Sequence, residues 1–215
     1  MIRTLLGLAA LTLAAGAAFP APPASRAEAL AALEHSVTER RAEAVVWVAN
    51  HDRMDDTKLL LKRLQQDESP FVRGYAEQGL WLLWSRSGDA ATDQAMARGV
   101  DEMQAGRHAA AIAAFSDVIR GRPDFAEGWN KRATAYYLAG EYAKSLADCD
   151  EVIKRNPHHF GALSGYGQIY FQLQQYEKAI AWWRRALEVN PNMVGVEINI
   201  KGAEQLLKER RGRST

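Results

Sequence analysis

The most constraining feature of the sequence is a pattern that recurs every 34 residues between Thr92 and Pro191. When the repeats start at Thr92, Ala126 and Phe160, the three strings align without a gap, and each closes on a proline. The eighth positions are small (Gly99, Ala133 and Gly167), and so are the twentieth (Ala111, Ser145 and Ala179). The twenty-fourth positions are Phe115, Cys149 and Trp183, and the prolines are Pro123, Pro157 and Pro191.

This pattern predicts that each repeat is a pair of amphipathic helices. A short turn joins the two helices near Gly106, Gly140 or Gln174–Gln175. Small residues at positions eight and twenty let the two backbones approach closely, and aromatic residues beside them fill the remaining space. The proline ends the second helix, because the residue before a proline is disfavoured in the α region. One helix pair cannot bury its apolar face alone, so we expect neighbouring pairs to stack into a solenoid.

The period and the order of small, large and proline positions resemble the tetratricopeptide repeat family. The second repeat is the clearest, with Trp129, Ala133, Tyr136 and Gly140 in the slots typical of that family. The resemblance covers about half of the chain and implies repeats at residues 92–125, 126–159 and 160–193, with residues 92–191 as their domain. It also implies a right-handed superhelix in which the first helix of each pair lines a concave surface.

Residues 28–88 predict a different block of helices. A helix ends at the acidic turn before Ser69, and Pro70 begins the next one, where its missing N–H costs nothing. The order of leucines, Asp, Pro, Val-Arg, Ala and Leu in this block resembles a HEAT repeat, with a weaker echo of it in residues 30–48. The expected fold class is therefore all-α: a right-handed α-solenoid of HEAT-like pairs, three tetratricopeptide repeats and a C-terminal capping helix.

Residues 194–215 are expected to form that capping helix and a basic tail. The apolar residues of this segment lie at helical spacing: Val196, Ile200, Ala203, Leu206 and Leu207. The opposite face is charged, so this helix can cover the last apolar surface of the solenoid while facing water.

Residues 1–27 have the layout of a secretory signal peptide, with Arg3 before an apolar run and small residues after it. Two cleavage points fit, after Ala17 or after Ala27. The apolar run is shorter than the roughly 20 residues that a membrane span needs, so an uncleaved anchor is the weaker alternative. We therefore expect an exported bacterial protein, located in the periplasm, with no transmembrane span in its mature chain.

Composition and motifs argue against several other functions. Lysine plus arginine is 27 against 26 acidic residues, a balance that does not indicate a nucleic-acid partner. The pair His158–His159 has no accompanying ligands at metal-binding spacing, and the acidic residues at 148, 150 and 151 are expected on a solvated helix face. The single cysteine, Cys149, is expected in the core. We expect no enzyme activity, no cofactor, no bound metal and no small-molecule substrate.

The functional prediction therefore concerns the concave groove. The family places several first-helix positions on that surface, and carrying those positions over gives these candidate partner-binding residues: Met96, Met103, Asn130, Lys131, Thr134, Tyr137, Ser164, Gln168 and Phe171. We expect them to bind a peptide or protein segment, which makes the chain a non-catalytic scaffold or adaptor. The alternative is a structural subunit of a cell-envelope assembly, bound through its HEAT-like block with the groove unused.

Overall fold

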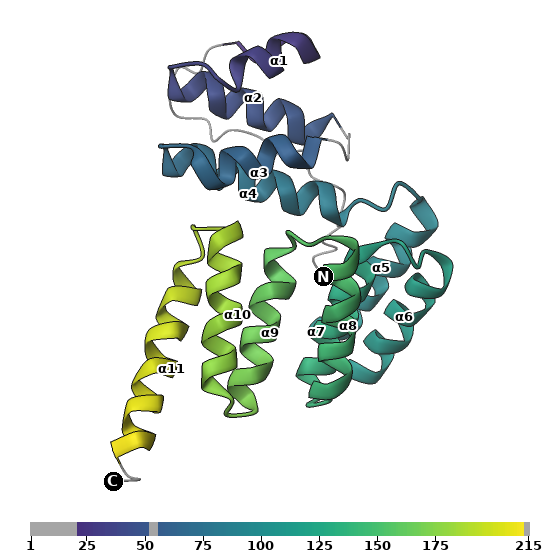
Figure 1. Ribbon diagram of the computed structural model, residues 1–215. Helices are drawn as coiled ribbons and strands as arrows, with labels where there is room; N and C mark the ends of the chain where they lie inside the picture. The colour runs from purple at the N-terminus through teal and green to yellow at the C-terminus, as the bar shows by residue number, and fades with distance from the viewer. Residues whose placement is uncertain (1–20, 52–55, 213–215) are drawn as a thin grey trace. The chain divides into compact units, whose positions relative to one another are not determined.

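The computed structural model of the chain describes residues 21–51 and 56–212. Within these ranges the protein is all-helical, with eleven helices and no strand (Figure 1), as the fold class predicts. The chain divides into two compact units between Arg86 and Ser87. Most of the expected signal peptide, residues 1–20, lies outside the described ranges.

The described part of the first unit contains four helices: α1 (Arg26–Ala32), α2 (Thr38–Asn50), α3 (Thr57–Gln66) and α4 (Pro70–Ser85). Pro70 is the first residue of α4, as the sequence predicts, because the first turn of a helix needs no N–H donor there. Arg41 on α2 donates to both carboxylate oxygens of Asp67, from Nε at 2.8 Å and from Nη2 at 2.9 Å. This buried ion pair fixes the end of α3 against α2.

The second unit contains seven helices, of which six form consecutive pairs: α5 (Ala90–Gln104) with α6 (His108–Gly121), α7 (Ala126–Leu138) with α8 (Tyr142–Arg155), and α9 (Phe160–Gln172) with α10 (Tyr176–Val189). The last helix, α11 (Val194–Gly212), packs on α10. Figure 1 shows the three pairs side by side, with α11 beside the last. The second unit is a helical solenoid.

The turns within the pairs fall where the sequence predicts them. Gly106 and Gly140 have φ values of 73° and 76°, in the left-handed region that glycine enters without a steric penalty. The third pair makes the same turn with Gln174, whose φ is 56°. The three turns therefore share one backbone geometry, although only two of them have glycine.

The small residues at position eight allow close helix packing in two of the three pairs. A Cβ atom added to Gly99 would lie less than 3.0 Å from the ring of Phe115, and one added to Gly167 would lie as close to the ring of Trp183. Each ring therefore lies directly on the glycine of its partner helix, where no larger residue fits. In these two pairs the ring at position twenty-four fills the space beside the small residue at position eight, as predicted.

The acidic residues of α8 differ from the prediction at one position. Asp148 is 4% exposed and accepts two hydrogen bonds from the Arg132 guanidinium, at 2.7 and 2.8 Å. Arg132 also donates to Ser116 Oγ at 3.0 Å, so one side chain joins α6, α7 and α8. The prediction that Asp148 lies on a solvated helix face is therefore wrong. Its partner Arg132 lies on another helix, sixteen residues earlier, so the spacing of residues along α8 does not indicate the pair.

The C-terminal helix α11 packs through the apolar residues that the sequence indicates. Val196, Ile200 and Ala203 are buried and form a cluster with Ile180 and Trp183 of α10. Among the residues that the structure describes, no helix combines the length and the apolar composition that crossing a membrane requires.

Candidate functional site

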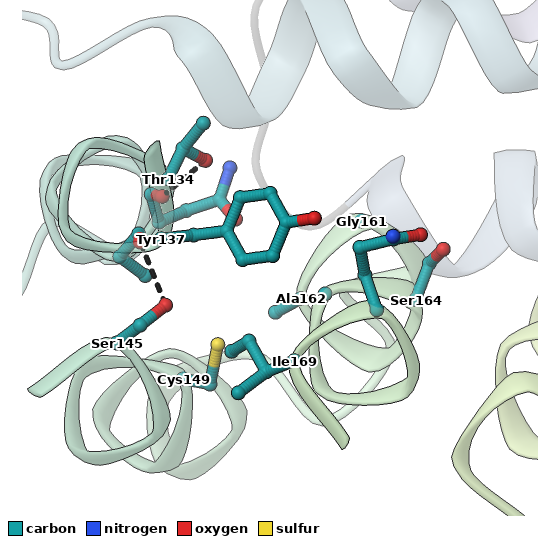
Figure 2. Close-up of a pocket in the computed structure, with 12 residues that line it drawn as sticks. Thr134, Tyr137, Ser145, Cys149, Gly161, Ala162, Ser164 and Ile169 are labelled. Carbon is teal, nitrogen blue, oxygen red and sulfur yellow. Dashed lines mark hydrogen bonds between the residues drawn. The ribbon is translucent and has the colours of Figure 1, made fainter. Parts of the chain in front are cut away.

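A cavity of about 250 Å³ opens between α7, α8 and α9. The residues that line it come from all three helices: Asn130, Ala133, Thr134, Tyr137, Ser145, Cys149, Gly161, Ala162, Ser164, Gly165, Gln168 and Ile169. In Figure 2 the Tyr137 ring reaches from α7 toward α9, and the Cys149 sulfur points into the space between the helices. The cavity thus lies at the junction of the second and third helix pairs.

Five of the nine candidate groove residues line this cavity: Asn130, Thr134, Tyr137, Ser164 and Gln168. They lie on α7 and α9, the first helices of two successive pairs. Residues that are 27 to 38 positions apart in the sequence therefore come together because the two helix pairs stack with the same orientation.

Three of the other four candidates lie elsewhere. Met96 is 8% exposed and belongs to the core cluster around Phe115, and Met103 packs against the same cluster. Phe171 is half-buried, with its ring 5.7 Å from the ring of Trp183. None of the three lines the cavity, because their apolar side chains pack between helices, and their partner-binding role stays a prediction.

The fourth candidate, Lys131, takes part in a buried network behind the cavity wall. Its Nζ lies 3.1 Å from Oε1 of Glu127, a residue that is 2% exposed. The other oxygen of Glu127 lies 3.1 Å from His159 Nε2 and accepts from Asn130 Nδ2 at 3.0 Å. Burial alone would raise the pKa of Glu127, but the hydrogen bond from His159 and the charge of Lys131 hold it below its ordinary value.

His159 links this network to the start of α9. Its Nδ1 accepts a hydrogen bond from the backbone N–H of Ala162 at 3.1 Å, and so caps the helix N-terminus. An imidazole that accepts at Nδ1 carries its proton on Nε2, which then donates to Glu127. The network therefore sets the positions of Asn130 and Ala162, which are two residues of the cavity wall.

Some of the polar side chains that line the cavity form hydrogen bonds within the protein, and others do not. Ser145 Oγ donates to the carbonyl of Ala133 at 2.7 Å, and Thr134 Oγ1 donates to the carbonyl of Asn130 at 3.0 Å. Within the part of the chain that the structure describes, the side chains of Ser164 and Gln168 form no hydrogen bond. Their donors and acceptors are free to bind a ligand.

Cys149 forms part of the cavity floor as a neutral thiol. Burial raises its pKa to about 12, and the nearby carboxylates of Asp148 and Asp150 act in the same direction. The thiol is 2% exposed, which confirms the prediction that Cys149 is a core residue. A thiol with so high a pKa is a poor nucleophile at neutral pH, so the cavity floor is chemically inert.

The groove positions predicted from the sequence do not include Ser145 and Cys149 of α8 or Ala162 and Ile169 of α9, which also line the cavity. The sequence predicts Ser145 and Cys149 only as packing positions within the second repeat. The signal that identifies Cys149 is the contrast at position twenty-four, where a cysteine replaces the ring present in the first and third repeats. Metal ligands are a separate question: in the described ranges, no group of three or more His, Cys, Asp or Glu residues is placed to bind a metal ion.

Comparison with protein families matches two parts of the chain. Residues 96–157 and residues 160–193 each match a family described as tetratricopeptide repeat. A comparison with curated proteins finds no match.

Solved structures of similar fold include several tetratricopeptide repeat domains. The first TPR of Spaghetti (RPAP3), bound to the HSP90 peptide SRMEEVD, matches with a TM-score of 0.52 and 24% identity, over 54% of this chain and 93% of that one. The Sgt2 TPR domain from Aspergillus fumigatus matches with a TM-score of 0.54 and 18% identity, over 57% and 83%. The TPR2B domain of yeast Sti1, in complex with pHsp70, matches with a TM-score of 0.52 and 20% identity, over 55% and 99%. At these identities the likeness concerns the fold, and the family matches show that residues 96–157 and 160–193 are tetratricopeptide repeats.

Proposed function

We propose that the chain is a protein-interaction module whose second unit binds a peptide segment across α7 and α9. The observation that carries this proposal is the cavity of about 250 Å³, which collects five predicted groove residues, among them Ser164 and Gln168, whose side chains have no hydrogen-bond partner among the described residues. Neutral donors and acceptors beside an apolar pocket suit a peptide, because its backbone needs hydrogen bonds and its side chains need burial.

The similar structures support the same class of function without identifying the ligand. The RPAP3 and Sti1 domains are named as complexes with an HSP90 peptide and with pHsp70. The peptide in the RPAP3 complex, SRMEEVD, is acidic, whereas no lysine or arginine lines the cavity of this chain. We therefore propose a peptide partner here, but not an acidic one.

The test uses peptides selected from a random displayed library on the full chain. Two substitutions in the cavity, Thr134→Glu and Gln168→Glu, place charge where the ligand backbone would lie, and should reduce the affinity of the selected peptides at least tenfold. The matched control changes two exposed second-helix residues outside the cavity, Lys154→Glu and Glu188→Lys, and should leave binding unchanged. If no peptides are selected, or if the two double variants bind equally well, this function is wrong.

We also propose that the chain is exported and that its signal peptide is cleaved after Ala17. The alternative cut after Ala27 would remove Arg26, which donates to both oxygens of the buried Asp56, at 2.5 and 2.6 Å. Mass spectrometry of the N-terminus of the mature protein tests this proposal. A chain that begins at residue 28, or one that keeps Met1, would contradict it.

The first unit is proposed to be a pair of HEAT-like repeats. The buried pair Arg41–Asp67 supports this assignment, since it joins an arginine of one helix pair to the turn before the last helix of the next. We propose no catalytic role for either unit.

A further inference from the structure

We infer that the cavity binds a single uncharged aromatic side chain of the peptide, and that the ligand thereby supplies the ring that the second repeat lacks. This inference rests on the proposed peptide-binding function and specifies the chemistry of the ligand. It follows from a comparison of the three repeats within this one chain.

The first and third repeats fill the space between their paired helices with a ring on a glycine. Phe115 lies on Gly99, and Trp183 lies on Gly167. The second repeat has Ala133 and Cys149 at the same two positions. A methyl group and a thiol occupy less space than a ring, so a volume on the order of one aromatic side chain is missing from the second repeat.

The third repeat does not fill this space from the other side. Gly161, Ala162 and Gly165 face the cavity from α9, and a Cβ atom on Gly165 would lie 3.8 Å from Cys149 Sγ, in ordinary contact. The cavity of about 250 Å³ is below the roughly 300–1,000 Å³ typical of pockets for whole small molecules. Its size suits one large side chain.

The cavity walls decide which large side chain fits. Its floor is apolar or neutral, formed by Ala133, Cys149 and Ile169, and no charged residue lines it. Lys131, which follows Asn130 on α7, is paired with Glu127, so a charged side chain from a ligand would lose its hydration without gaining a partner among the lining residues. The Tyr137 ring stands at the side of the cavity, where it can contact a second ring edge to face (Figure 2).

The first measurement compares peptides. Each peptide selected from the random displayed library is synthesised again with its aromatic residue replaced by alanine, leucine or glutamate. We expect the selected peptides to share an aromatic residue, and we expect its replacement by alanine to weaken binding to the full chain about tenfold or more. Leucine should give an intermediate loss, and glutamate should give a loss at least as large as alanine.

The second measurement fills the cavity with the pair of residues that the other repeats use. The double variant Ala133→Gly/Cys149→Phe rebuilds the glycine–ring pair of the first repeat, so it should fold with unchanged helix content. In this variant the aromatic peptide and its alanine form should bind with equal, weak affinity. Gly165→Met fills the same space from α9 and serves as the second variant if the double variant does not fold.

The outcomes separate this inference from the function on which it rests. If selected peptides lose affinity with Thr134→Glu/Gln168→Glu but show no aromatic preference, the ring-binding inference is wrong and peptide binding stands. An alanine replacement that costs the same affinity in the wild type and in the filled variants also overturns it. If no peptide binds the full chain, both proposals fail.

Discussion

Gln174 holds a backbone conformation that its two counterparts, Gly106 and Gly140, adopt at no steric cost. Its φ of 56° brings Cβ close to the neighbouring carbonyl oxygen, a contact that glycine lacks. The turn still forms, with the N–H of Gln174 donating to the carbonyl of Phe171 and that of Gln175 to Tyr170. The hydrogen bonds of the turn therefore offset a local conformational cost.

The substitution Gln174→Gly should raise the free energy of unfolding by about 1 kcal/mol, because it removes the left-handed penalty. Gly140→Gln creates the same conflict in the second repeat and should lower the free energy of unfolding by a similar amount. Urea denaturation followed by circular dichroism measures both. Equal stability of all three proteins would show that the turn relaxes without strain.

The raised pKa of Cys149 makes the free energy of unfolding depend on pH, and the direction of the shift gives the sign of this dependence. The folded protein disfavours the thiolate, whereas the thiol of the unfolded chain titrates near its ordinary value of 9.0. The stabilising effect of the neutral thiol is therefore complete below about pH 9 and is lost as the pH rises toward about 12.

The measurement compares the wild type with Cys149→Ala between pH 8 and pH 11. The stability of the wild type should fall more steeply than that of the variant across this range, since only the wild type carries the titrating thiol. Alkylation by iodoacetamide at pH 8 should also be much slower in the folded than in the unfolded protein. Parallel stability curves together with rapid alkylation would contradict the buried, neutral thiol.

At the scale of the helices, position seven of the second and third repeats contacts equivalent neighbouring helices through different side chains. Arg132 holds position seven of the second repeat, where it contacts Ser116 of the preceding repeat and Asp148 of its own. Tyr166 holds the same position in the third repeat. Its hydroxyl donates to the preceding repeat's Asp150, and its ring stacks on Trp182 at 3.9 Å. Position seven therefore joins successive repeats by a side-chain hydrogen bond in both cases, to Ser116 from Arg132 and to Asp150 from Tyr166. The ion pair with Asp148 and the stacking on Trp182 join the two helices of one repeat.

The glycines of the helices differ in what surrounds them, and this gives a matched pair of substitutions. Gly167→Ala should destabilise the protein by about 1–3 kcal/mol, because its methyl group would overlap the Trp183 ring. Gly202→Ala on α11 meets open space and should stabilise the protein by about 0.5–1 kcal/mol through helix propensity. Thermal unfolding of the two variants checks this, and effects of the same sign would contradict the close packing on Gly167.

At the scale of the whole molecule, each unit has its own core and the repeats depend on their neighbours. In the second unit, the described core clusters lie around Phe115, around Cys149 and Tyr166, and around Trp183. The last cluster is completed by α11, which packs on α10 and covers its apolar face. The C-terminal helix is therefore part of the fold of the third repeat.

Ending the chain after Met193 should lower the melting temperature by on the order of 10 °C, since Ile180 and Trp183 then lose their apolar cover. The shortened chain should also bind the dye ANS more strongly than the full chain. Ending the chain after Gly212 keeps α11 and should change neither measurement. Equal melting temperatures for the two truncated chains would show that α11 is not needed to complete the core.

Much of the second unit could be predicted from the sequence, because its constraints are local and recur. The 34-residue period placed the helices, Gly106 and Gly140 placed two turns, and Val196, Ile200 and Ala203 gave the buried face of α11. The candidate site was predicted only in part. The family positions identified Asn130, Thr134 and Gln168, but gave no sign that Met96 is buried in the core.

The sequence by itself determined the all-helical repeat architecture, since period, small residues and proline are properties of the chain read in order. Only the tertiary structure decided which residues meet between segments far apart in the sequence: Arg132 with Asp148, Glu127 with His159, and Cys149 with Gly165 of α9. These contacts depend on how far apart and at what angle the stacked helices lie, and the packing of many side chains sets that geometry at once. The cavity arises from the same cause, because an unfilled space belongs to the packing of three helices and to no single residue.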